Sequence, residues 1–222
     1  MKKSLKMIFA ALALTACAFG FAGCGDGGDN TDPGGNGGNT DITTPGGDTG
    51  KDDSVVFEAE YTYVDDLEGA GSSNAAKGKA MILSATNASN GHYIGFTHKK
   101  GLTITFEITS DKATTANLKV GLTPAEGMNA IKIGTDTFIV KVNDTKITYT
   151  EQNVVDNNTN MNKRQFKKYD IGMVNLKEGL NIITLTIGEN EYVNGKSGGP
   201  SIDAIYLTSD AGLTWEPYED NI

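Results

Sequence analysis

The stretch LKEGLNIITLTIGENEYVNGKSGGPSIDAIYL, residues 176–207, decides the fold of this chain. In its first apolar run, residues 180–187, leucine and isoleucine are interleaved with asparagine and threonine, which favours a half-buried β-strand over a helix. Residues 202–207 form a second short β-rich run, and it carries one carboxylate, Asp203. A polar, glycine-rich loop, residues 188–201, connects the two runs. Because loops held by a rigid sheet often carry binding residues, we expect a candidate binding loop here.

The same two-residue period recurs in short runs upstream. These runs are residues 55–61, 102–109, 118–122 and 138–142, and glycine, asparagine and aspartate punctuate the segments between them. No long stretch has a helical period. This pattern predicts an all-β fold, an antiparallel β-sandwich over residues 55–210. Residues 211–222 are expected to form a C-terminal tail in which Trp215, the only tryptophan, packs rather than forms an exposed platform.

Composition narrows the possible partners and chemistry. The net charge of -9 and the sequence pI of about 4.7 argue against nucleic acid, which requires a basic face. Cys17 and Cys24 both precede the predicted domain, so the domain itself can form neither a disulfide nor a cysteine metal site.

Residues 1–23 have the pattern of a secretory signal, with lysines followed by an apolar run too short for a comfortable membrane span. The run ends in Phe-Ala-Gly before Cys24, and the chain then turns polar. This ending resembles the lipobox of bacterial lipoproteins, in which the cysteine becomes the lipidated N-terminus. Cys17 is an alternative lipidation site, and an ordinary signal peptide is another alternative. We expect an extracellular protein held on the bacterial cell membrane by a lipid at Cys24 and by no other membrane contact.

Residues 24–54 consist almost entirely of glycine, aspartate, asparagine, threonine and proline. Such a segment cannot bury enough apolar surface to offset its ordering entropy, so we expect a flexible linker. Fully extended, a linker of roughly 30 residues reaches about 100 Å. It would present the domain at a distance from the membrane.

Two acidic residues at the start of the domain are candidates for holding a metal ion. Glu58 and Glu60 are two positions apart, so in a strand both side chains leave the same face. Like charges this close repel unless they are solvated or bridged by a cation, and Ca²⁺ takes carboxylate oxygens. Asp203 is the third carboxylate if the first and last strands are neighbours. The alternative is a plain solvent-facing strand edge.

Four short segments resemble carbohydrate-binding modules of families 6 and 35. They are FEAE at 57–60, SNGHYIGF at 89–96, LKEGLNII at 176–183 and SIDAI at 201–205, in the same order as in those modules. The resemblance implies a jelly-roll sandwich with a structural Ca²⁺ between the first and last strands. Its matching ligands are Glu58, Glu60 and Asp203.

The resemblance also implies a sugar site in the loops at one end of the sandwich. Phe166 lies where the family usually has a tryptophan, so it is the candidate stacking platform, with Tyr169 in reserve. Tyr192 and Asn194 lie where the family places a sugar-binding asparagine. A flat ring suits the apolar face of a pyranose, and amide groups suit its hydroxyls. The alternative for Phe166 is a loop residue packed inward.

Lys163, Arg164, Lys167 and Lys168 form a dense basic cluster in this acidic protein. One interpretation is that the cluster draws an anionic glycan, such as a uronic-acid polymer, toward Phe166. Arg164 would then contact the sugar carboxylate, because its guanidinium suits bidentate contacts. The alternative is a solvated surface.

Together these features predict a monomeric surface protein that binds a polysaccharide or oligosaccharide and catalyses no reaction. His92 and His98 are the only histidines, and neither lies near a recognisable nucleophile. The main alternative is a protein-interaction or adhesion domain on the same sandwich, without sugar binding. A small hydrolase is a third hypothesis, because acidic residues are plentiful.

Overall fold

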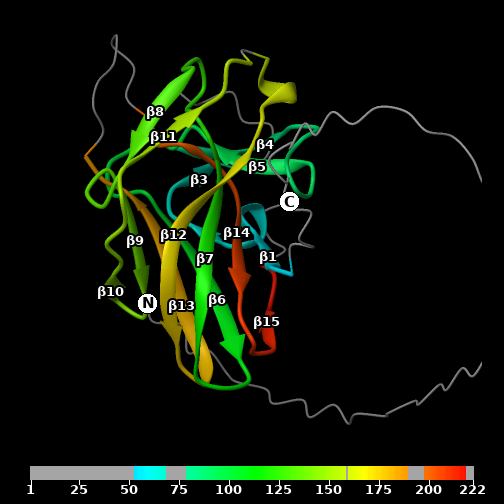
Figure 1. The fold of residues 1–222 in the computed structure, drawn as a ribbon. Helices are drawn as coiled ribbons and strands as arrows, with labels where there is room; N and C mark the ends of the chain where they lie inside the picture. The colour runs from blue at the N-terminus through cyan, green and yellow to red at the C-terminus, as the bar shows by residue number, and fades with distance from the viewer. Residues whose placement is uncertain (1–52, 69–78, 159, 190–197, 219–222) are drawn as a thin grey trace, which may run out of the picture. The chain divides into compact units, whose positions relative to one another are not determined.

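The computed structural model describes residues 53–68, 79–158, 160–189 and 198–218, which form a β-sandwich (Figure 1). Sheet A has the order β12 (Lys167–Leu176), β7 (Thr114–Thr123), β14 (Ser201–Thr208), β5 (His92–Gly95), β4 (Ala80–Ser84) and β3 (Leu67–Glu68), and β1 (Val55–Glu58) also pairs with β14. Sheet B has the order β10 (Thr145–Lys146), β9 (Phe138–Val142), β13 (Gly179–Ile187), β6 (Thr103–Ser110) and β15 (Leu213–Trp215), and β2 (Tyr63–Val64) also pairs with β6.

Smaller elements complete the described part of the chain. β8 (Ala130–Ile133) and β11 (Gln152–Val155) pair separately, and η1 (Ala59–Tyr61) and η3 (Met161–Lys163) are single 3₁₀ turns. Among the described strands, every pairing is antiparallel except that of β3 with β4. The predicted all-β antiparallel sandwich is therefore confirmed. Within the described residues, no helix has the length and apolar character needed to span a membrane.

Consecutive strands cross repeatedly from one sheet to the other, as in a jelly roll. The turns from β6 to β7, from β12 to β13 and from β14 to β15 all change sheets, and all three lie at the lower end of the sandwich in Figure 1. β8 and β11 lie at the opposite end, together with the loops that follow β7 and β11. The sequence-based candidates for sugar binding around Phe166 belong to that opposite end.

The core lies between the two sheets and follows the predicted period of two. Its centre consists of fully buried leucine, isoleucine, valine and phenylalanine side chains from the long strands: Ile104, Phe106, Ile108, Leu118, Val120, Leu122, Ile183, Leu185 and Ile187. Apolar residues on alternating positions of two facing sheets bury the most surface with the fewest unpaired polar groups. The alternation seen in the sequence is thus the cause of the sandwich.

One residue in β13 departs from the predicted alternation. Leu180 is 48% exposed, and Asn181 is fully buried in its place. The Asn181 amide group donates to the carbonyls of Lys177 and Gly179, both at 2.9 Å, and its Oδ1 accepts from Asn143 Nδ2 at 2.8 Å. A buried amide is tolerated when its hydrogen bonds are satisfied, and here it joins two turns.

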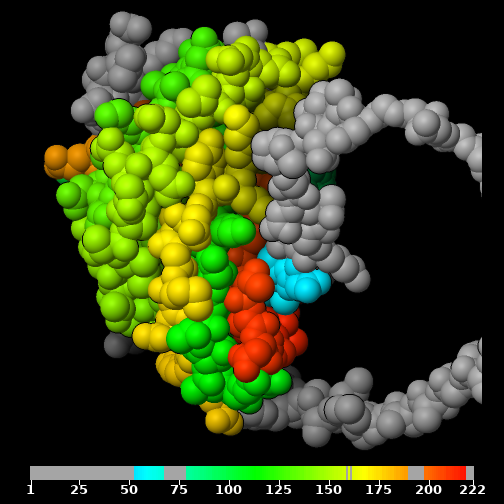
Figure 2. All heavy atoms as spheres, viewed as in Figure 1, coloured from blue at the N-terminus to red at the C-terminus, as the bar shows by residue number. Residues whose placement is uncertain are grey.

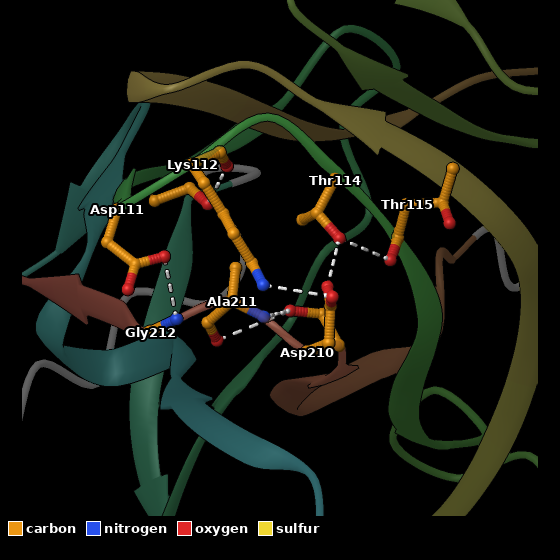
Figure 3. Close-up of polar contacts among 9 residues, drawn as sticks. Asp111, Lys112, Thr114, Thr115, Asp210, Ala211 and Gly212 are labelled. Carbon is orange, nitrogen blue, oxygen red and sulfur yellow. Dashed lines mark hydrogen bonds and ion pairs between the residues drawn. The ribbon is translucent and has the colours of Figure 1, made fainter.

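The sandwich extends beyond Asp210, which corrects the predicted C-terminal tail. β15 adds to the edge of β6, and Trp215 meets Phe57 edge to face with ring centroids 5.5 Å apart. Figure 3 shows how the turn before β15 is fastened to the turn between β6 and β7. Asp210 accepts from Lys112 Nζ at 2.9 Å, and the Gly212 amide donates to Asp111 Oδ1 at 2.9 Å. These contacts and the partial burial of Trp215 hold β15 against the sandwich.

Candidate functional site

β1 and β14 lie side by side, which brings two of the predicted acidic residues together. The register pairs Glu58 with Ala204, so Asp203 is the adjacent residue of β14. Ser89, in the loop between β4 and β5, joins the two carboxylates. Its amide donates to Asp203 Oδ1 at 2.9 Å, and its hydroxyl donates to Glu58 Oε2 at 2.5 Å. The expectation that the strand of Glu58 and the strand of Asp203 are neighbours is confirmed.

Glu60 also lies near Glu58 and Asp203, but it belongs to a 3₁₀ turn and not to the predicted strand. β1 ends at Glu58, and the next three residues form η1, so Glu60 does not extend the strand on the face of Glu58. Its side chain is fully buried, and Asn90 Nδ2 donates to Glu60 Oε1 at 3.3 Å. Burial raises the pKa of Glu60 to about 7, with a smaller contribution from the charge of Glu58. The three carboxylates, hereafter the acidic cluster, therefore influence one another.

The acidic cluster contains the type of donor that a hard cation takes. Burial raises the pKa values of Glu58 and Asp203 as well, and the charge of Asp203 adds to the rise at Glu58. Desolvated carboxylates are the oxygen donors that Ca²⁺ takes. As the side chains stand, no three His, Cys, Asp or Glu side chains of the described residues are arranged to hold a metal ion. The donor types fit calcium, whereas their present spacing is set by hydrogen bonds from Ser89 and Asn90.

Asp203 is buried, with 1% of its surface exposed, in β14, which pairs with β7 and β1 in sheet A. Figure 2 shows the face of the domain on which β12 (yellow), β7 (green) and β1 (cyan) are visible. The Tyr206 hydroxyl donates to Asp203 Oδ2 at 3.2 Å, and Lys168 Nζ lies 3.9 Å from the centroid of the Tyr206 ring. A Cβ at Gly121 would approach Asp203 Oδ2 to 3.2 Å and Tyr206 Cε2 to 3.1 Å. The position of Asp203 therefore depends on glycine at residue 121.

Arg164 is buried, which corrects the prediction that it contacts a glycan carboxylate. Its side chain is 1% exposed. Its Nη1 donates to the carbonyl of Pro124, and its Nη2 donates to the carbonyl of Ala125 at 3.1 Å. The guanidinium thus ties the segment before β12 to the loop after β7. Only the lysines of the predicted basic cluster have exposed side chains.

Phe166 and Tyr169 pack in different places and do not form one sugar platform. Phe166 is half-buried against Tyr93, with ring centroids 5.0 Å apart, in a small cluster beneath the loop between β4 and β5. Tyr169 is half-buried against the main core, and its hydroxyl accepts a hydrogen bond from the Val155 amide at 3.3 Å. Phe166 is thus packed partly inward, and the role of Phe166 or of its reserve Tyr169 as a stacking platform stays a prediction.

Three further sequence-based candidates, Tyr192, Asn194 and Cys24, lie outside the described residues. Their roles in sugar binding and lipidation stay predictions.

A groove opens along β6, where two short strands share one of its edges. β2 pairs with Ile104 and Thr105, and β15 pairs with residues 108–110. Because β13 covers the other edge of β6, the ends of β2 and β15 meet opposite Glu107. A hollow of about 280 Å³ lies at this point.

Aromatic rings and carboxylates line this hollow, hereafter the aromatic groove. Its lining residues are Tyr61, Tyr63, Trp215 and Tyr218, with Glu107, Glu216, Thr62 and Thr105. Tyr63 and Tyr218 meet edge to face, with ring centroids 6.5 Å apart and an interplanar angle of 86°. Their side chains are 56% and 46% exposed, so both rings are accessible to a ligand.

Asn90 connects the acidic cluster with the aromatic groove. Its Nδ2 lies 3.3 Å from Glu60 Oε1 and 3.2 Å from the hydroxyl of Tyr61, to which it also donates. At the same end of the groove, the Tyr218 amide donates to the Tyr61 carbonyl at 2.7 Å. Tyr61 is therefore held from two sides.

Among the groove residues, only Trp215 stands out in the sequence, and there it is expected to pack. The available signal is a pair of aromatic clusters, YTY at 61–63 and TWEPY at 214–218. They lie near opposite ends of the domain sequence. Only the strand register along β6 shows that they meet.

No protein-family model and no curated protein matches the sequence. Solved structures resemble it at low identity. The GH26-CBM35 β-(1,4)-mannanase of Podospora anserina is 18% identical with a TM-score of 0.49, and the match covers 73% of this chain but only 29% of the mannanase. A family 35 carbohydrate-binding module from Clostridium thermocellum is 14% identical with a TM-score of 0.47, and the match covers 69% of this chain and 96% of the module.

The CBM35 of Paenibacillus barcinonensis is 16% identical with a TM-score of 0.46, and the match covers 69% of this chain and 98% of the module. Family 35, to which the four sequence segments point, thus recurs among these structures. At these identities and TM-scores, the likeness says nothing about the ligand of this chain.

Proposed function

We propose that this chain is a non-catalytic carbohydrate-binding protein that holds a sugar in the aromatic groove. The observation that carries the proposal is that Tyr63 and Tyr218 expose their rings in one hollow that also contains two carboxylates. Aromatic rings stack on the apolar face of a pyranose, and carboxylates accept hydrogen bonds from its hydroxyls. Both groups that a sugar requires are present in this groove.

The size of the groove favours a short stretch of a glycan over a whole large ligand. Ligand pockets usually measure on the order of 300 to 1,000 Å³, and the groove, at about 280 Å³, is at the lower limit. The remainder of a polysaccharide would therefore extend into solvent on either side.

Calcium has a supporting role in this proposal. Glu58, Glu60 and Asp203 would hold the ion, whose positive charge would offset the repulsion between these carboxylates. Glu60 belongs to η1, which ends at Tyr61 in the wall of the groove. A neutralised acidic cluster would therefore keep that wall in place.

The proposed location is the outside of the bacterial cell. A lipid at Cys24 would anchor the chain, and the segment up to residue 54 would act as a tether for the domain. The protein would then hold a polysaccharide near the cell surface or near partner enzymes.

Gel retardation of the full chain in neutral and uronic polysaccharides tests the proposal. Tyr63→Ala and Tyr218→Ala should each weaken retention roughly 2- to 10-fold, since an aromatic contact contributes roughly 0.5 to 1.5 kcal/mol. Met173→Ala is the matched control, because Met173 is 63% exposed but lies on β12 in sheet A. Equal retention of all variants would contradict binding in the groove. Failure to retain any glycan, with capture of a cell-surface protein, would favour the adhesion alternative.

A further inference from the structure

We infer that the aromatic groove selects glycans that carry a protonated amine, such as glucosamine polymers, over neutral and uronic glycans. The inference rests on the proposed sugar binding in the same groove and names its substrate class. It follows from the charges around the groove and from the arrangement of its rings.

The groove is acidic and lacks a compensating cation among its described lining residues. Glu107 projects from the exposed face of β6, and Glu216 follows β15 directly. No lysine, arginine or histidine is among the described residues that line the groove. Lys141 projects from the same face of sheet B, but it pairs with Thr184, which in turn pairs with Thr105. It is therefore two strands away from β6, roughly 10 Å at the usual strand spacing.

The negative charges of Glu107 and Glu216 favour some classes of sugar over others. A uronic carboxylate in the groove would face two like charges and find no partner, which disfavours binding. A neutral sugar would gain only stacking and hydrogen bonds. An ammonium group would gain the same contacts together with charge-assisted hydrogen bonds to Glu107 or Glu216.

The aromatic rings add to this preference. Tyr63 and Tyr218 stand at 86° with their centroids 6.5 Å apart, so they form a corner rather than a flat platform. A cation within about 6 Å of an aromatic centroid is attracted to the ring face, which corresponds to roughly a 2- to 30-fold gain in affinity. A small ammonium group next to a pyranose fits such a corner, and Glu107 and Glu216 line the same groove.

Calorimetric titration of the full chain with glucosamine and N-acetylglucosamine oligomers of equal length tests the inference. The two ligands share one backbone and differ at the nitrogen of each residue, which is a neutral acetamide in one oligomer and an amine, protonated in slightly acidic buffer, in the other. We expect the amine oligomer to bind about tenfold more tightly, with a preference that declines as salt is added. In the double variant E107Q/E216Q the affinity ratio should fall toward one. In Glu151→Gln, which removes an exposed partner of Lys132 far from the groove, the ratio should stay unchanged.

Equal affinity for the two oligomers, or a ratio unaffected by E107Q/E216Q, would overturn the inference. If both oligomers bind equally and Tyr63→Ala weakens both, the proposed sugar binding stands and only the amine preference fails. If neither oligomer nor any polysaccharide binds, or if Tyr63→Ala changes nothing, the proposed function fails as well.

Discussion

The amide of Ser89 donates a hydrogen bond to Asp203 Oδ1 at 2.9 Å across 114 positions of the chain. The hydroxyl of the same serine binds Glu58, and the next residue, Asn90, reaches Glu60 and Tyr61. The loop between β4 and β5 therefore binds residues of both β1 and β14 and also contacts Tyr61 in the aromatic groove. Changes in the acidic cluster should consequently alter both stability and sugar affinity.

Calcium removal is expected to destabilise the protein. A ligand that binds only the folded state adds about 2.7 kcal/mol when its concentration is 100 times the dissociation constant. Chelation should therefore lower the melting temperature of the wild type, and Asp203→Asn should abolish that response. Asp210→Asn, at an exposed ion pair with Lys112, should keep it. Identical melting curves of the wild type in calcium and in chelator would contradict a calcium site.

The metal-free protein should lose stability as the pH rises. The pKa of Glu60 is raised from 4.5 to about 7 in the folded state, so the folded chain holds a proton that the unfolded chain has released. The stabilisation is present below pH 4.5 and disappears as the pH passes about 7, and it is on the order of 3 kcal/mol.

Urea unfolding in chelator at a series of pH values measures this effect. In Glu60→Gln, the free energy of unfolding should depend less on pH between the pKa values of 4.5 and about 7. With calcium present, the stabilisation by the bound ion should increase as the pH rises, because protons compete with the ion for the carboxylates. A wild-type stability that rises with pH in chelator would show that Glu60 is not buried as described.

Gly121→Ala should disturb the acidic cluster from the neighbouring strand. Its new Cβ would crowd Asp203 and Tyr206, at an expected cost of about 1 to 3 kcal/mol and with a weaker response to calcium. Gly134→Ala is the matched control, because the nearest atom would be 3.8 Å away. That change should alter the free energy of unfolding by less than about 1 kcal/mol. If the two variants were equally stable, the described contact between residue 121 and Asp203 would be contradicted.

Arg164→Ala should destabilise the fold by about 3 kcal/mol or more, because hydrogen bonds to charged groups contribute roughly 1.5 to 3 kcal/mol each. The variant leaves the buried carbonyls of Pro124 and Ala125 without their donor. Chemical denaturation measures the loss, and Lys163→Ala, at an exposed position of the same segment, is the control. A fully stable Arg164→Ala variant that loses binding to uronic polymers would restore the sugar-contact interpretation.

Much of the fold can be predicted from local patterns, since the period-two runs place buried side chains between the sheets. The neighbourhood of Glu58 and Asp203 can also be predicted, because both lie in segments that resemble one family. The 3₁₀ turn that carries Glu60 cannot, since two glutamates at i and i+2 are equally compatible with a continuing strand. The burial of Arg164 cannot be predicted either, because its partners are backbone carbonyls, which every residue type carries.

The aromatic groove is the least predictable part of the site. Tyr63 and Tyr218 come together only because β2 and β15 occupy the same edge of β6, and strand order is not a local property of the sequence. Trp215 is expected to pack, and it does pack on Phe57, but it also lines the groove. One residue thus serves both the core and the candidate site.

The fluorescence of Trp215 during an oligosaccharide titration tests the central claim most directly, because it is the only tryptophan of the chain and it lines the groove. Binding in the groove predicts a saturable change in this fluorescence, with an apparent affinity roughly 2- to 10-fold weaker in Tyr63→Ala. Sugar binding that leaves the fluorescence of Trp215 unchanged and is undiminished in Tyr63→Ala would contradict the account.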